Sequence, residues 1–244
     1  MATSRSHPMA QHFQTRGLFI TGTDTDVGKT YVSCQMIDSM RAQGLSVGAY
    51  KPVCSGVLPT LGESGTSQPR WHDVDELWQA TERLFPRDRL APQCFRAPLA
   101  PPLAAALEGK EVSPLMLREG AAWWHGRVEW LVVEGAGGIF APISREDVVL
   151  DLAADLGYPV LIVARPTLGT INHTLLTIAA IRHRCLAVSG VVFTAAQPFD
   201  SVAAADNARL ITELSGVPVI ATLHPGQPWP VNVASTTLFA NRST

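Results

Sequence analysis

Short apolar runs alternate with helical patterns along most of the chain. Runs of the length of buried strands fall at 17–23, 45–53, 129–138, 158–166, 187–195 and 217–223. Helical patterns lie at 28–44, 73–84, 113–126, 147–157, 168–184 and 200–216, and a short helix is expected at the end of 94–107. Nearly continuous apolar strands that alternate with helices are typical of a parallel sheet covered on both faces. The pattern predicts a doubly wound α/β fold with a mostly parallel sheet.

The remaining segments lack this pattern. Residues 1–16 are polar and have no apolar run of the kind that a secretory signal requires, so we expect a flexible tail. Pro, Gly and Ser dominate 56–70, which predicts a loop. The segment from His224 onward contains three prolines, and we predict no element there. No internal repeat or change of composition divides the rest, so we expect 17–244 to form one domain.

Composition narrows the class of protein. Of the 244 residues, 46% are apolar and 16% charged, which is enough to build a large core. No run approaches the roughly 18 apolar residues that a membrane helix needs, and no Lys/Arg block suggests nucleic acid or anionic lipid as a partner. The four cysteines, at 34, 54, 94 and 185, lack metal-ligand spacing. We therefore expect reduced thiols in a cytoplasmic protein with no membrane or nucleic-acid partner.

The first motif with chemical content is GTDTDVGKT, at 22–30, between an apolar strand and a helix. A glycine-rich turn in this context exposes backbone N–H groups to phosphate. Lys29 would lie near the β- and γ-phosphates, and the hydroxyl of Thr30 would bind Mg²⁺. Five residues separate Gly22 from Gly28, where the common P-loop has four. The motif predicts a nucleotide site of a variant type.

Charged residues follow other predicted strands. Lys51, in KPVCSG, would bind a carboxylate or stabilise a transferring phosphoryl group, although a lysine at a strand end is more often a solvated surface charge. Glu134 ends an apolar strand and precedes Gly-Ala-Gly-Gly, which indicates a ligand for Mg²⁺. Asp73 is either a second ligand or the N-cap of its helix, with Asp75 as a rival. Because ligands gather at the carboxyl ends of parallel strands, we expect one shared site.

A fifth motif is LGTINHTLLT, at 168–177. Here Gly-Thr opens a helix, and its N-terminal amides suit an anion such as a carboxylate. His173 lies in the first turn, where a histidine is more often a structural hydrogen-bonding residue than a base.

In the order and spacing of five segments, the chain resembles the ATP-dependent dethiobiotin synthetase family. These segments are GTDTDVGKT, KPVCSG, the Asp73 segment, VEGAGG and LGTINHTLLT. The resemblance extends over about 17–223. It implies a P-loop NTPase-like fold and a homodimer with substrate near the interface. It also implies an ATP- and Mg²⁺-dependent cyclo-ligase of biotin biosynthesis, which joins 7,8-diaminopelargonic acid and CO₂ into dethiobiotin and releases ADP and phosphate.

The resemblance assigns roles to individual positions. Nucleotide contacts would be Thr25, Asp26, Val27, Gly28, Lys29, Thr30, Asp73, Glu134, Gly135, Ala136, Gly137, Thr194 and His224. The Mg²⁺ ligands would be Thr30, Asp73 and Glu134. Lys29 and Lys51 would be the catalytic residues, by stabilising carbamate and phosphoryl oxygens. The diamine would contact Lys51 and Ser55, and its carboxylate would contact Gly169, Thr170 and Asn172 across the dimer.

One position departs from the family. Asparagine often follows the strand that reads GVVF here, where it can read adenine, but this chain has Thr194. A hydroxyl cannot present the fixed donor and acceptor pair of an amide. Base selection is therefore open, with the His224-Pro225-Gly226 segment aligned to another base-side loop.

Two rival functions follow from related ATPases. A non-catalytic ATP switch, as in chromosome-partitioning proteins, carries a second lysine four residues before the glycine of Gly-Lys-Thr, where this chain has Asp24. An amidotransferase of the corrin pathway adds a glutaminase domain, for which this chain has no room. Both rivals are therefore less favoured than the synthetase.

Overall fold

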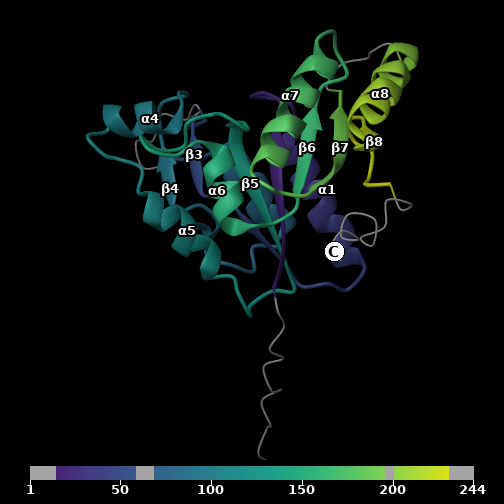
Figure 1. The fold of residues 1–244 in the computed structure, drawn as a ribbon. Coiled ribbons are helices and arrows are strands. Elements are labelled where there is room, and N and C mark those ends of the chain that lie inside the picture. Colours follow the sequence, from purple (N-terminus) through teal and green to yellow (C-terminus); the bar gives the residue numbers. More distant parts are fainter. Residues whose placement is uncertain (1–14, 59–68, 196–200, 231–244) are drawn as a thin grey trace, which may run out of the picture.

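A six-stranded sheet forms the centre of the molecule (Figure 1). The computed structural model describes residues 15–58, 69–195 and 201–230. The strand order is β2-β5-β1-β6-β7-β8, and every pairing is parallel. The strands are β1 (Arg16–Gly22), β2 (Val47–Tyr50), β5 (Trp130–Gly138), β6 (Val160–Ala164), β7 (Val188–Thr194) and β8 (Val219–Leu223). The predicted parallel α/β fold is confirmed.

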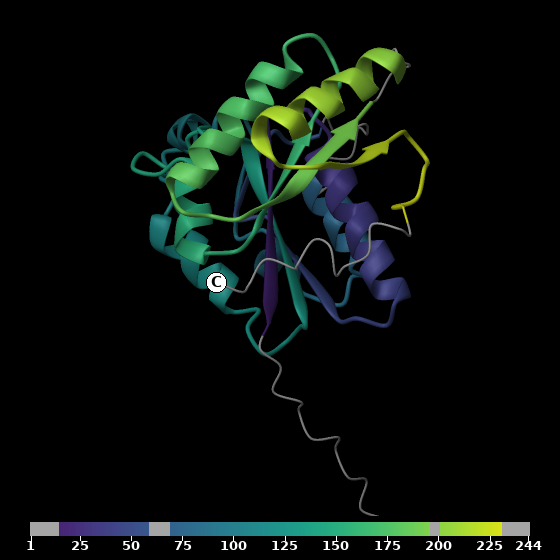
Figure 2. The ribbon, with the colours of Figure 1, turned by 45° about the vertical axis from the view of Figure 1, so that its right-hand side comes forward.

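Helices cover both faces of this sheet, and α1 and α7 lie on opposite sides of it in Figure 2. The helices are α1 (Lys29–Ala42), α2 (His72–Ala80), α3 (Arg87–Leu90), α4 (Pro101–Leu107), α5 (Pro114–Ala122), α6 (Val149–Leu156), α7 (Thr170–His183) and α8 (Ser201–Ser215). The longer ones begin and end close to their predicted limits. Of the described elements, α3 is the helix that the sequence pattern did not predict, since four residues are too few for a helical period.

The apolar strands are buried on both faces, as their sequence requires. Leu18, Phe19 and Ile20 of β1 have no exposed surface, and all five residues of β6 are buried. Because β1 lies between β5 and β6, its loop to α1 emerges in the middle of the sheet. The P-loop is therefore flanked by strand ends on both sides.

The strand predicted at 45–53 is corrected by the structure. It ends at Tyr50, and Val53–Ser55 (β3) pairs with Gln93–Phe95 (β4) in a separate two-stranded parallel sheet. The backbone N–H of Lys51 donates to the Leu90 carbonyl, 2.7 Å away, and Pro52 has no N–H to donate. Both features take the chain out of the main sheet. The sequence predicts a connection with a short helix at 94–107, so the strand β4 is an element that it did not predict.

The structure describes only part of the tail and loops that the sequence predicts. Arg16, placed at the end of the expected tail, already pairs with Trp130 in β1, and its guanidinium lies 5.5 Å from the centre of the Trp130 ring. The strand thus begins one residue earlier than predicted. Residues 1–14, 59–68 of the predicted loop and 231–244 lie outside the described residues. Among the helices of the described segments, none is long and apolar enough to cross a membrane.

Candidate active site

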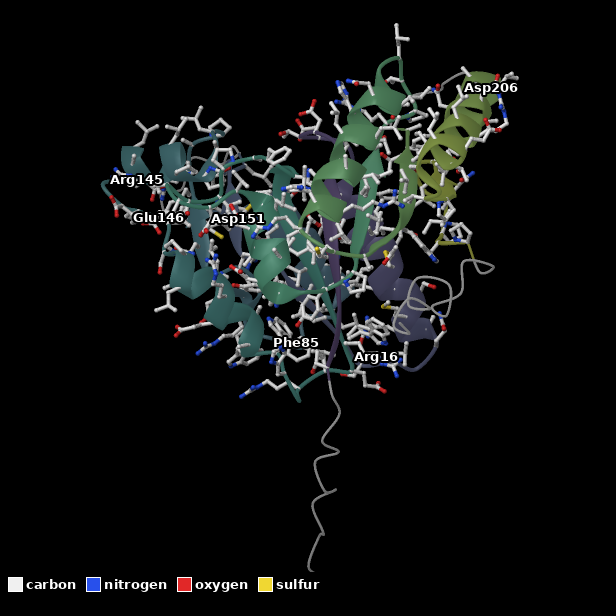
Figure 3. The ribbon with its side chains drawn as sticks, in the orientation of Figure 1. Arg16, Phe85, Arg145, Glu146, Asp151 and Asp206 are labelled. Atoms are coloured by element: carbon white, nitrogen blue, oxygen red, sulfur yellow. The ribbon has the colours of Figure 1, made fainter. Side chains whose placement is uncertain are left out.

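Three charged side chains are buried at the carboxyl ends of the central strands. The exposed fractions are 6% for Lys29, 3% for Lys51 and 1% for Glu134. Charged side chains such as Arg145 and Asp206 instead project from the periphery of the molecule (Figure 3). Because charges are rarely buried without partners, this cluster indicates a functional site.

The P-loop joins β1 to α1 and has a backbone that only particular residues accept. Gly28, at the start of α1, has a φ of 88°, and a Cβ there would lie 2.9 Å from Oγ1 of Thr194. A side chain at this position would therefore be strained and crowded. The ammonium of Lys29 donates to the carbonyl of Asp24 at 3.1 Å. Burial, together with the nearby charge of Lys51, lowers the pKa of Lys29 to about 8.

Lys51 lies between two carboxylates. Its Nζ is 2.6 Å from Oε1 of Glu134 and 2.7 Å from Oδ2 of Asp73. Burial by itself would lower the pKa of Lys51, but the two carboxylates outweigh burial and raise it above its usual value. The Lys51 ammonium in turn lowers the pKa of Asp73 to about 2. The alternative of a solvated surface lysine is therefore wrong, because Lys51 is buried and paired with two carboxylates.

The structure excludes the alternative that Asp73 is the N-cap of its helix. The N-cap of α2 is Trp71, with no side-chain capping bond, so Asp73 does not cap its helix. Its rival Asp75 forms ion pairs with Arg70 and Arg87 and does not reach the cluster of Lys51 and Glu134. Asp73 is therefore the acidic residue of α2 that joins the cluster.

Two hydroxyl groups of α1 fix the carboxylate of Glu134. Thr30 Oγ1 donates to Oε1 at 2.8 Å, and Ser33 Oγ lies 2.7 Å from Oε2. The Ser33 hydroxyl is also 3.0 Å from the carbonyl of Lys29. The sequence reasoning missed Ser33, although its position one turn after Thr30 places it on the same face of α1. Each oxygen of Glu134 thus lies within hydrogen-bond distance of a hydroxyl group of the P-loop helix.

The donor set fits Mg²⁺. Oε1 of Glu134 and Oδ2 of Asp73 converge on one point, and the hydroxyl of Thr30 lies against the same Glu134 oxygen. Among the described residues, no group of three or more His, Cys, Asp or Glu side chains could hold a metal ion. Mg²⁺ commonly takes one or two carboxylates and completes its shell with phosphate and water. These two carboxylates and one hydroxyl are a set of that kind.

The residues that follow Glu134 form a close backbone turn and contact Lys51. At Gly137, where φ is 74°, a Cβ would lie 2.8 Å from Cβ of Ala141, so the backbone turns closely there. The carbonyl of Gly135 is 3.5 Å from Nζ of Lys51. Ser55, on β3, donates its hydroxyl to the carbonyl of Leu99 at 2.7 Å. These contacts place Gly135 beside the cluster, and Ser55 lies at the end of the small sheet.

Thr194 and His224 lie on the other side of the P-loop, at the ends of β7 and β8. The buried Thr194 hydroxyl donates to the carbonyl of Val27 in the P-loop. The carbonyl of His224 accepts a hydrogen bond from the Tyr31 hydroxyl at 2.7 Å. Thr194 is therefore a brace for the P-loop, because its one hydroxyl proton is already donated.

The residues expected to bind the substrate carboxylate lie apart from the cluster. Gly169 precedes α7 with a φ of 92°, Asn172 is exposed, and the buried hydroxyl of Thr170 has no hydrogen-bond partner among the described residues. Within 15–58, 69–195 and 201–230, no hydrogen bond or ion pair joins 169–172 to the charged cluster. In the described part of the chain, these two groups of residues are therefore not linked by a hydrogen bond or an ion pair.

This parallel sheet, with a strand–P-loop–helix unit at its centre and a buried lysine–carboxylate cluster beside it, defines a P-loop NTPase-like protein. Residues 16–228 match the family described as AAA domain. A protein named ATP-dependent dethiobiotin synthetase BioD, from Anaeromyxobacter dehalogenans (strain 2CP-1 / ATCC BAA-258), is 43% identical over 90% of this chain and 92% of its own. One of the same name from Bacillus cereus (strain B4264) is 37% identical over 85% of this chain and 82% of its own.

The chain belongs to the ATP-dependent dethiobiotin synthetase family. Among solved structures, a ParA family ATPase from Chlorobium tepidum TLS is 12% identical, with a TM-score of 0.49 and coverage of 92% of this chain and 88% of that chain. A similarity this distant says nothing about function.

Proposed function

We propose that this protein is a dethiobiotin synthetase that uses ATP, or another nucleoside triphosphate, and Mg²⁺. The single observation that carries the proposal is the ammonium of Lys51, buried between Glu134 and Asp73 beside the P-loop. A reaction that builds up negative charge on transferred oxygens needs such buried, oriented positive charge. The names of the relatives support the choice of reaction.

The proposed reaction has three steps. One amine of 7,8-diaminopelargonic acid adds to CO₂ and loses a proton, which gives a carbamate. A carbamate oxygen then takes the γ-phosphoryl group, and the bond from the γ-phosphorus to the bridging oxygen breaks to release ADP. Finally the second amine attacks the carbonyl carbon of this mixed anhydride, loses a proton and expels phosphate, which closes the ureido ring.

The residues contribute charge and position, since phosphoryl transfer needs little covalent chemistry from the protein. The N–H groups of 25–30 would hold the phosphates, and Lys29 would leave the Asp24 carbonyl to contact them. Lys51 would stabilise the carbamate and phosphoryl oxygens. Mg²⁺ held by Thr30, Asp73 and Glu134 would neutralise charge on the β- and γ-phosphates. Ser55 would lie beside the diamine.

The substrate carboxylate would be bound across a homodimer. The first turn of α7 has an exposed Asn172 and a Thr170 hydroxyl that has no hydrogen-bond partner among the described residues, and a helix N-terminus suits an anion. Leu168, just before this turn, is fully exposed, and Phe140 after β5 is largely exposed. A second subunit packed here would take both apolar side chains out of water. A second copy would cover them and bring its 169–172 to the cluster of the first.

We place the enzyme in the cytoplasm, where its four free cysteines would stay reduced. A non-catalytic ATP switch is the less favoured alternative, because Asp24 stands where such switches carry a lysine.

The test is nucleotide hydrolysis with and without the diamine, together with a direct assay for dethiobiotin. A synthetase releases phosphate only with diamine and bicarbonate present. Hydrolysis that ignores the diamine, with no dethiobiotin formed, would contradict the proposal.

A further inference from the structure

Tyr31 ties the P-loop helix to the segment that follows β8. Its hydroxyl lies 2.7 Å from the carbonyl oxygen of His224 and 2.8 Å from that of Gln227. Tyr31 directly follows Thr30 in the first turn of α1, whereas His224 lies 193 positions further along the chain. One side chain therefore spans the interval between the phosphate-binding turn and residues 224–227, which we name the β8 loop.

The β8 loop is also held by its own contacts. The N–H of Gln227 donates to the carbonyl of His224 at 3.0 Å, which closes a turn, and Trp229 just beyond it is buried in the core. At its other end, Leu223 pairs with Thr194 of β7. Between these two anchors, the Tyr31 hydroxyl joins the turn to α1.

The strand order shows which end of a nucleotide would meet this loop. The P-loop emerges from β1, with β5 and β2 on one side and β6, β7 and β8 on the other. Lys51 and Glu134, the charged groups for the reacting phosphate, lie on the side of β2 and β5. If the γ-phosphate lies by Lys51 and Glu134, the rest of the phosphate chain runs from β2 and β5 toward β7 and β8. The nucleoside would then lie by Thr194 and the β8 loop.

Thr194 contributes little to holding a base, because its hydroxyl proton is donated to the carbonyl of Val27. The backbone of the β8 loop is the neighbouring surface, and the Tyr31 hydroxyl links it to α1. We propose that Tyr31 is a positioning residue, which fixes the β8 loop against the nucleoside of the bound triphosphate. The proposal rests on the proposed function, since it requires a nucleoside triphosphate on the P-loop.

Removing the Tyr31 hydroxyl tests this role. Loss of one hydrogen bond at a neutral group corresponds to a factor of about 2–10 in binding. Tyr31→Phe should therefore raise the Kd for Mg²⁺–ATP by that factor and raise the KM for ATP in parallel. It should leave kcat at saturating ATP and the Kd for Mg²⁺–tripolyphosphate, which lacks a nucleoside, within error of the parent protein.

The chain offers a matched control. Tyr50 also directs its hydroxyl at two backbone carbonyls, those of Leu117 at 2.8 Å and Met116 at 3.3 Å, but these belong to α5. Tyr50→Phe should cost comparable stability in urea unfolding and leave both Kd values unchanged. A merely structural role of Tyr31 would make the two variants alike.

The outcomes separate the two proposals. A selective loss of ATP affinity in Tyr31→Phe supports the positioning role. An equal loss for ATP and tripolyphosphate, or no loss for either, overturns it while leaving nucleotide use intact. Failure of the parent protein to bind both ligands overturns the proposed function, and the role of Tyr31 with it.

Discussion

Lys51 and Glu134 stand 83 positions apart and form an ion pair of 2.6 Å in which both side chains are buried. The same ammonium reaches Asp73 at 2.7 Å. Charges taken out of water persist only when each finds a partner of opposite sign. The arrangement therefore holds a positive charge in place beside the P-loop, which is the feature that the proposed chemistry uses.

Replacement of Lys51 by methionine should lower kcat strongly. Loss of an electrostatic stabiliser costs about 10²–10³-fold in turnover. Glu134 would lose its buried partner, so the free energy of unfolding should fall by about 3–5 kcal/mol. Turnover is measured at saturating diamine and at a temperature where circular dichroism shows the variant folded. Lys110→Met, at an exposed lysine paired with Glu108, is the control. Near-normal turnover in Lys51→Met would remove Lys51 from the mechanism.

Mg²⁺ and the ammonium of Lys51 should compete for the carboxylate oxygens of Glu134 and Asp73. The ammonium occupies the point on which the Glu134 and Asp73 oxygens converge, and a cation bound by both oxygens must displace it. We expect Lys51→Met to bind Mg²⁺ more tightly than the parent protein without nucleotide, as measured by calorimetry. Adding Glu134→Gln should abolish the gain. Equal or weaker Mg²⁺ binding in Lys51→Met would show that the ion does not use this pair.

Ser33 should affect stability and nucleotide binding through its contact with Glu134. Its hydroxyl is 2.7 Å from Oε2 of the buried carboxylate, and hydrogen bonds to charged groups contribute about 1.5–3 kcal/mol. We expect Ser33→Ala to lower the free energy of unfolding by that amount and to weaken Mg²⁺-dependent nucleotide binding. Ser215→Ala is the control, because Ser215 bonds the carbonyl four residues earlier in α8, as Ser33 does in α1. If the two variants behave alike, the bond to Glu134 contributes nothing.

A site shared across the dimer can be tested by mixing subunits. Asn172→Ala should weaken diamine binding more than nucleotide binding, while Lys51→Met should be nearly inactive. In an exchanged mixture, about half of the dimers are mixed and each owns one site without a lesion, so about a quarter of the sites should be active. Mixing Lys51→Met with Glu134→Gln should restore none, since both residues belong to the same subunit's half of the site. No recovery in the first mixture, with exchange demonstrated, would argue against sharing.

Base preference should be weak. Thr194 donates its hydroxyl proton to the P-loop, and phosphate and Mg²⁺ contacts are the same for every nucleotide. We expect CTP, GTP or UTP to support turnover within about an order of magnitude of ATP, because the base discrimination that is lost is worth about 1–3 kcal/mol. Thr194→Asn should raise the preference for ATP, and Thr212→Asn, at an exposed position of α8, should not. The measurement is kcat/KM for four nucleotides. A parent preference for ATP above about a hundredfold would show that backbone groups read the base.

The sequence by itself determined the main sheet and the P-loop. Six apolar runs predicted the six strands that form it, and the glycines of 22–30 predicted the turn between β1 and α1. Those signals are local, since an apolar run, a glycine with positive φ and a helix start are each written in a few neighbouring residues. The short strands β3 and β4 escaped because three residues carry too little pattern.

Only the tertiary structure decided which side chains meet. The burial of Lys51, the choice of Asp73 over Asp75, the hydroxyl of Ser33 on Glu134 and the bond from Tyr31 to His224 all join residues that are distant in sequence or lie on different elements. Such contacts depend on the order and register of the strands, which place the ends of β2 and β5 on one side of the P-loop and those of β7 and β8 on the other side. No local pattern carries that information, because the partners become neighbours only when the sheet is assembled.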